Sequence, residues 1–111
     1  MIKITFLTRD DLYVGLTSKG HAEYSDYGTD IVCSAVSSIT QSLALGILEV
    51  LGIKATYKVD ESNGYLELGL PNIEDERLLD NSQVLFKTAF VSLKDIQSGY
   101  PSNIKVEVKR L

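Results

Sequence analysis

Residues 30–52 read DIVCSAVSSITQSLALGILEVLG, and this stretch decides the arrangement of the rest of the chain. Its apolar residues recur at spacings of three and four, which is typical of one buried face of an α-helix. Thr29 or Asp30 can accept hydrogen bonds from the unpaired N–H groups of the first turn. Gly52 suits the left-handed residue that often follows a helix. The pattern therefore predicts the main helix of the fold over residues 30–51.

The segments on either side of this helix alternate between apolar and polar residues, as half-buried strands do. In the second strand we expect Val14 and Leu16 to face inward, and Asn63-Gly64 is typical of a type I′ hairpin turn. A second helix is predicted over residues 75–98, before the stop at Gly99-Tyr100-Pro101. The order β-β-α-β-β-α-β predicts an α+β fold, with two helices packed on one mostly antiparallel sheet. The five expected strands cover residues 2–7, 13–17, 54–61, 65–70 and 104–108.

Length and charge limit the classes of protein to consider. The chain has 111 residues, the size of one domain, so we expect a single domain over residues 1–111. Its 11 Lys and Arg against 15 Asp and Glu give a net charge of −4, which argues against direct nucleic-acid binding. We find no uninterrupted apolar run of membrane-spanning length and no signal-peptide pattern. These features predict a protein that does not act at a membrane, and its single cysteine favours a reducing, cytoplasmic setting.

The chain contains one cysteine and one histidine, Cys33 and His21. Cys33 has no partner for an internal disulfide, and a zinc site of four Cys and His ligands is excluded, so no metal or cofactor is expected. Cys33 lies in the first turn of the predicted main helix, where the unpaired N–H groups favour an anion and therefore a reactive thiolate. His21 opens the loop before that helix and could hold the thiolate and then deliver a proton to a leaving group.

Each of these residues also has a structural interpretation. Cys33 could be an inert buried thiol, and His21 a loop residue that takes no part in chemistry. Asp30 could orient His21 as the third member of a triad, or cap the helix through the N–H of Val32 or Cys33. The loop over residues 20–29 is long, and its glycines and its two tyrosines, Tyr24 and Tyr27, could let it close over a substrate.

Two segments of the sequence, Gly20-His21-Ala22 and residues 28–37 (GTDIVCSAVS), resemble the ribosomal-processing cysteine protease family, Prp. The resemblance implies a cysteine endopeptidase that forms homodimers. Its substrate would be the N-terminal extension of a large-subunit ribosomal protein, protein twenty-seven, cut after an aromatic residue. Ser34 departs from the pattern, because Ala is commoner at that position in the family.

The resemblance also implies roles for particular residues. His21 and Cys33 correspond to the catalytic pair, while Gly20, Asp30 and Ser37 correspond to the supporting residues. We expect backbone N–H groups near Cys33 and Ser34 to hold the oxyanion. The substrate loop would include Ala22, Tyr24, Tyr27 and Gly28.

Two alternatives stay open. The chain could be a non-enzymatic ribosome-assembly or protein-binding module in which Cys33 only packs. It could also be a different thiol enzyme or a redox sensor. A slowly reacting thiol would favour the first, and a fast-reacting thiol without peptide cleavage would favour the second.

Overall fold

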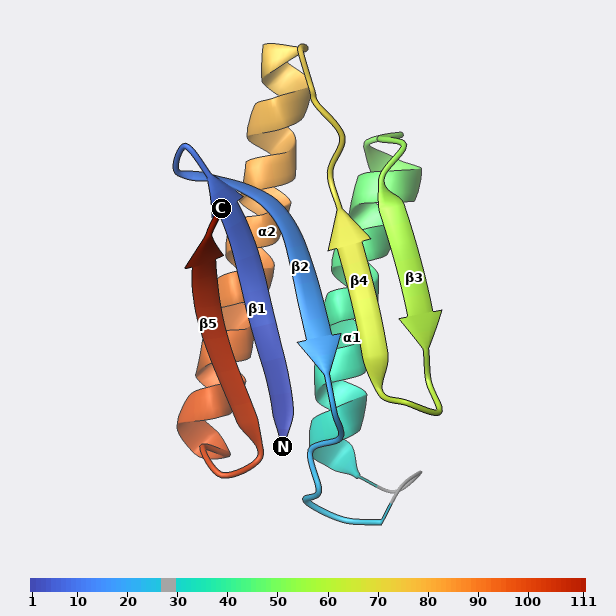
Figure 1. Ribbon diagram of the computed structural model, residues 1–111, viewed down its shortest axis with the longest axis vertical. Coiled ribbons are helices and arrows are strands. Elements are labelled where there is room, and N and C mark those ends of the chain that lie inside the picture. The colour runs from blue at the N-terminus through green and yellow to red at the C-terminus, as the bar shows by residue number, and fades with distance from the viewer. Residues whose placement is uncertain (27–29) are drawn as a thin grey trace.

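The computed structural model describes residues 1–26 and 30–111, and its elements follow the predicted order. The five strands form one sheet in the order β3-β4-β2-β1-β5. Neighbouring strands are antiparallel except β1 and β5, which run parallel. Figure 1 shows both helices on the same face of this sheet. The predicted α+β fold is confirmed. Its elements are β1 (Ile2–Arg9), β2 (Leu12–Lys19), α1 (Ile31–Leu45), η1 (Gly46–Val50), β3 (Thr56–Asp60), β4 (Tyr65–Gly69), α2 (Glu76–Gly99) and β5 (Ile104–Arg110).

The core lies between the sheet and the two helices. Alternate residues of each strand point toward the helices, as the period of a half-buried strand requires. On β1 these residues are Ile2, Ile4 and Phe6, which are at most 4% exposed. Phe6 packs edge-on against Phe90 of α2, with ring centroids 5.2 Å apart. The helices contribute mainly Val32, Val36, Leu43, Ala44, Ile47, Phe86, Ala89 and Leu93.

The predicted main helix is present but changes its hydrogen bonding near its end. After Leu45 the chain continues as the π-helical turn η1, in which the Leu51 N–H donates to the Gly46 carbonyl. Gly52 follows in the left-handed conformation with φ of 66°, as predicted. Ile31–Val50 is also long and apolar enough to cross a membrane by length and composition alone. That is weak evidence, because helices that build a core pass the same test.

A β-bulge corrects the predicted orientation of the second strand. Leu7 pairs with Gly15, but the next residue of β1, Thr8, pairs with Tyr13, which leaves Val14 as the extra residue. Tyr13 rather than Val14 therefore packs against the core, and its ring stacks on Phe86 with centroids 5.9 Å apart. The Gln83 side chain bonds both to the Tyr13 N–H, at 2.7 Å, and to the Tyr13 carbonyl, at 2.9 Å.

The predicted type I′ turn at Asn63-Gly64 is wrong. Gly64 has φ of 59°, but Asn63 does not have a positive φ, and a longer loop joins Asp60 to Tyr65. The Asp60 carboxylate accepts hydrogen bonds from Ser62 and from the side-chain amide of Asn63, at 2.8 and 2.7 Å. These bonds lower the pKa of Asp60. A local Asx arrangement thus replaces the tight turn.

Candidate active site

One end of the sheet brings the predicted site residues together. Figure 1 shows the start of β1, the end of β2, the β3–β4 loop and the start of α1 at the lower end of the molecule. The turn that enters β5 lies at the same end. Cys33, the third residue of α1, shares a hollow with residues of β1, β2 and the β3–β4 loop.

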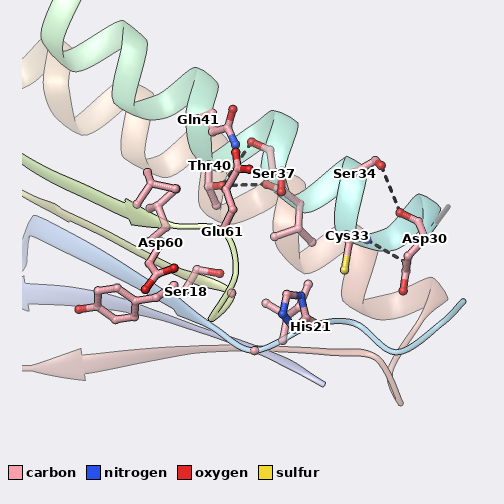
Figure 2. A pocket seen from close by; sticks show the side chains of 17 residues that line it. Ser18, His21, Asp30, Cys33, Ser34, Ser37, Thr40, Gln41, Asp60 and Glu61 are labelled. Carbon is pink, nitrogen blue, oxygen red and sulfur yellow. Dashed lines mark hydrogen bonds between the residues drawn. The ribbon is translucent and has the colours of Figure 1, made fainter. Parts of the chain in front are cut away.

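A hollow of about 350 Å³ opens between the first half of α1 and the β3–β4 loop. Figure 2 shows the sulfur of Cys33 pointing from α1 into this hollow, toward the imidazole of His21. A second hollow, of about 750 Å³, is lined by His21, Glu23, Ser25, Asp26, Asp30, Cys33 and Ser62. Cys33 and His21 line both hollows, so they lie where the two meet. The first hollow is also lined by Ser18, Gly20, Ser34, Ser37, Thr40, Gln41, Val59, Asp60, Glu61 and Tyr65.

The Cys33 side chain is half-buried: it packs against the edge of the core and also lines this opening. Its Sγ accepts a hydrogen bond from the backbone N–H of Ala22, at 3.2 Å. Sulfur is a weak acceptor as a thiol and a much better one as a thiolate, because a charged acceptor strengthens the bond. The contact therefore places a donor where negative charge on the sulfur would be stabilised.

Asp30 is the N-cap residue just before α1 and is 3% exposed. Its Oδ1 accepts from the N–H groups of Val32 and Cys33, at 2.9 and 3.0 Å. Its Oδ2 accepts from the N–H groups of Tyr24 and Ser25, at 2.8 and 3.1 Å. Burial opposes the charge, but these four backbone bonds outweigh it and lower the pKa of Asp30. Asp30 is thus the helix cap, and it also fastens the preceding loop to the helix.

Two glycines let backbone segments pass close to one another beside His21. Gly20 has φ of 92°, and a Cβ there would collide with the Met1 carbonyl oxygen. The Gly20 N–H donates to the Gly64 carbonyl at 2.8 Å. A Cβ on Gly64 would lie 2.6 Å from the Gly20 carbonyl oxygen and 3.0 Å from His21 Cε1. Only glycine lets the β3–β4 loop approach His21 this closely.

Ser37 and Ser34, two further residues of the predicted site, lie on α1 beside the first hollow. Ser37 is exposed on α1 and lines the first hollow, as does Ser34, whose hydroxyl donates to the Asp30 carbonyl at 3.1 Å. The two N–H groups predicted to hold an oxyanion already have acceptors, because Cys33 donates to Asp30 Oδ1 and Ser34 donates to the Asp30 carbonyl. Their role in catalysis stays a prediction, and it requires each group to share or exchange its acceptor.

The predicted substrate loop is only partly described. Ala22 is fully buried, and neither Ala22 nor Tyr24 lines either of the two hollows. The Tyr24 ring packs edge-on against Tyr100, with centroids 5.3 Å apart. Tyr27 and Gly28 lie outside the described residues.

Two contributions to the site were missed from the sequence. The first is the β3–β4 loop with Gly64, Asp60 and Glu61; the Asn-Gly pair showed a turn there but not which segment it would touch. The second is Asn103, whose side-chain amide donates to the Ala22 carbonyl at 3.0 Å across 81 positions of the chain. No local pattern around Asn103 indicates this contact.

A half-buried cysteine at the start of a helix, with a histidine beside it in an open hollow, is the arrangement of a thiol-dependent hydrolase. Comparison with known proteins gives the same class. Residues 1–105 match the family model for the cysteine protease Prp. The chain therefore belongs to the Prp family of cysteine proteases.

Individual relatives agree with this assignment. The ribosomal processing cysteine protease Prp of Mycoplasma genitalium is 32% identical over 94 residues, which covers 82% of this chain and 84% of the relative. The Bacillus subtilis protein of the same name is 26% identical over 87 residues, or 78% of each chain. A crystal structure of the Staphylococcus aureus protease Prp with a covalently linked product peptide has the same fold. Its TM-score is 0.87 at 24% identity, covering 98% of this chain and all of that one.

Proposed function

We propose that this chain is the endopeptidase that removes the N-terminal extension of a large-subunit ribosomal protein, protein twenty-seven, with Cys33 as nucleophile and His21 as general acid and base. The observation that carries the proposal is the position of the Cys33 sulfur. It faces His21 in a hollow open to solvent and has a backbone donor 3.2 Å away. The names of the relatives support the substrate, because they are called ribosomal processing proteases.

The mechanism follows from these positions. His21 takes the thiol proton, and the Cys33 thiolate attacks the scissile carbonyl carbon to form a tetrahedral intermediate. The C–N bond then breaks, and the imidazolium gives its proton to the leaving amine, which leaves a thioester on Cys33. Water attacks the thioester while His21 accepts a proton from it. The C–S bond then breaks, the acid product leaves, and the proton held by His21 returns to the sulfur.

The charge around the site favours a basic peptide. Among the described residues that line the two hollows there is no Lys or Arg, and five are acidic: Glu23, Asp26, Asp30, Asp60 and Glu61. Asp30 is buried and accepts four backbone bonds, and Glu23 lies 3.6 Å from the N-terminal ammonium, so the acidic charge that a substrate meets comes mainly from Asp26, Asp60 and Glu61. Opposite charge raises the encounter rate and favours binding of a cationic peptide over an acidic one.

We also propose that the protein works as a homodimer in the cytoplasm. A reducing compartment keeps a lone reactive thiol free. The exposed apolar residues Val84 and Val91 of α2 and Leu45 of α1 offer area for a second copy. Light scattering coupled to size exclusion tests the dimer, and a molar mass of one chain at micromolar concentration would contradict it. Cell fractionation tests the compartment.

The function is tested by incubating the purified protein with the extension peptide and analysing the products by mass spectrometry. We expect one cut after an aromatic residue, and loss of that cut in Cys33→Ala and His21→Ala. Ser37→Ala and Ser38→Ala form a matched pair, because both serines are exposed on α1 but only Ser37 lines the first hollow. We expect reduced cleavage in Ser37→Ala and unchanged cleavage in Ser38→Ala.

The outcomes separate the alternatives. Full cleavage by Cys33→Ala would contradict the mechanism. No cleavage by the unmodified protein, with Cys33 slow to react with iodoacetamide, would favour a binding module. No cleavage with a fast-reacting thiol would favour a different thiol enzyme.

A further inference from the structure

Asn103 lies in the turn between α2 and β5, far from Cys33 in the sequence, yet its contacts lead directly to the site. Its side-chain amide donates to the Ala22 carbonyl at 3.0 Å, and Ala22 donates its own N–H to Cys33 Sγ at 3.2 Å. Ala22 is fully buried, so its backbone has no water to replace either partner. The Ala22 residue is therefore held between the Asn103 amide and the nucleophile.

The backbone of Asn103 is itself held by two hydrogen bonds to other segments. The Asn103 N–H donates to the Tyr100 carbonyl at 3.0 Å, and its carbonyl accepts from the Ile2 N–H at 2.9 Å. These bonds tie the turn to the end of α2 and to the start of β1. The position of the Ala22 donor thus depends on the rigid end of the sheet rather than on the loop alone.

Three N–H groups in the first turn of α1 donate hydrogen bonds to Asp30. The Val32 and Cys33 N–H groups donate to Asp30 Oδ1, and the Ser34 N–H donates to the Asp30 carbonyl. The Ala22 N–H, by contrast, is a backbone donor that reaches the sulfur itself. A fixed donor aimed at the site of developing charge stabilises it without reorganisation.

We propose that Asn103 is a positioning residue for the reaction, and that it holds the Ala22 N–H against Cys33 so that this donor stabilises negative charge on the sulfur. The proposal deepens the proposed function, because it assumes that Cys33 is the nucleophile. A residue with a merely structural role would affect stability but would not change how readily the folded protein forms its thiolate.

Two substitutions of similar size remove the donor in different ways. Asn103→Asp places an acceptor against the Ala22 carbonyl and adds a charge, while Asn103→Leu removes the donor without adding charge. An effect that both variants share cannot come from the added charge. Asn81→Asp is the matched control, because Asn81 is exposed on α2 and is not among the residues that line either hollow.

The measurement is the rate of Cys33 alkylation by iodoacetamide as a function of pH. The chain has a single cysteine, so the reaction reports on Cys33 alone. We expect the midpoint of the pH profile to rise by about one pH unit or more in both Asn103 variants, since such a shift corresponds to the loss of one hydrogen bond to a charged acceptor. We expect kcat for peptide cleavage to fall about tenfold with KM nearly unchanged, because the donor acts on the reacting sulfur. Asn81→Asp should match the unmodified protein in the midpoint of alkylation and in kcat.

An unchanged midpoint in folded Asn103→Leu would overturn the proposal, even if cleavage were lost. The proposed function would fail in a different way. In that case Cys33→Ala would still cleave the peptide, while the pH profile of Cys33 alkylation would still change in the Asn103 variants. If neither Asn103 variant folds, the unmodified protein provides the test by NMR. The Ala22 amide proton should then shift with pH at the midpoint of Cys33 alkylation, and an amide that does not follow this midpoint would contradict the proposal.

Discussion

The most informative perturbation of the fold is Asp30→Asn, because Asp30 joins the helix start to the loop before it. The carboxylate accepts four backbone N–H bonds while 3% exposed. An amide oxygen can still accept from Val32 and Cys33 and cap α1. The amide nitrogen would face the N–H groups of Tyr24 and Ser25, and a donor cannot accept from them.

The magnitude follows from the two bonds lost. A hydrogen bond to a charged group contributes about 1.5 kcal/mol or more, so we expect the free energy of unfolding to fall by about 3 kcal/mol. For a domain of this size the melting temperature would drop by roughly 13 °C. Asp75→Asn is the matched control. Asp75 caps α2 from an exposed position through one bond, to the Leu78 N–H at 2.8 Å. Asn caps nearly as well as Asp, so that variant should lose less than about 0.5 kcal/mol.

The pH dependence gives a second check on the same variant. The pKa of Asp30 is lower in the folded protein than its ordinary value of 3.8, because four backbone donors stabilise its charged form despite burial. The stabilisation that the Asp30 carboxylate provides is therefore fully present above the pKa that it has in the unfolded chain. It is lost as pH falls through the lower pKa of the folded protein. Urea unfolding at pH 7 should show the full difference in free energy of unfolding between Asp30→Asn and the unmodified protein. That difference in free energy should become smaller below about pH 4. An Asp30→Asn variant as stable as Asp75→Asn at pH 7 would refute the reasoning.

Three further predictions concern the bulge, the glycine at the site and the charge of the hollow. Gln83→Leu leaves the N–H and carbonyl of Tyr13 without their partner, and chemical unfolding should show a loss of about 2 to 3 kcal/mol; a loss below about 0.5 kcal/mol would show that the bulge does not need Gln83. Gly20→Ala should lower both the cleavage rate and the melting temperature, because φ of 92° and the Met1 carbonyl leave no room for a Cβ. The Cβ of the control Gly99→Ala would meet no atom within 4 Å, so its cleavage rate and melting temperature should be unchanged or slightly higher. Glu61→Gln should raise KM for a cationic peptide about two- to threefold at low salt, while the exposed Glu74→Gln should not; equal KM values would argue against the acidic hollow as a binding feature.

The elements could be predicted from the sequence because their signals are local. Apolar spacing gave the two helices to within a residue or two, apart from the π-helical turn at Gly46–Val50. The capping role of Asp30 also follows from its position before the helix. Two of the errors are local, at the π-helical turn and at the turn of Asn63-Gly64, whereas the third depends on pairing between distant segments. Tyr13 replaces Val14 in the core because of a bulge set by the register of β1 against β2, which alternation within one strand cannot reveal.

The catalytic candidates could be predicted from their residue types, but the contacts that hold them in place could not. A single cysteine at a helix start and a single histidine before it pointed to the pair, and the structure places both on the same two hollows. The bonds from Asp30 to Tyr24 and Ser25 require a loop that folds back on the helix. The contacts of Gly64 with His21 and of Asn103 with Ala22 join segments that meet only in the finished sheet.

The measurement that tests the central claim most directly is the intact mass of the protein after acid quench during cleavage of the extension peptide. The account predicts a thioester on Cys33 whose mass exceeds that of the free protein by the N-terminal product less one water, and fragmentation should place it on the peptide containing Cys33. The adduct should be absent from Cys33→Ala, which should leave the peptide intact. Cleavage by Cys33→Ala, or an acyl group found on another residue, would contradict the claim that Cys33 is the nucleophile.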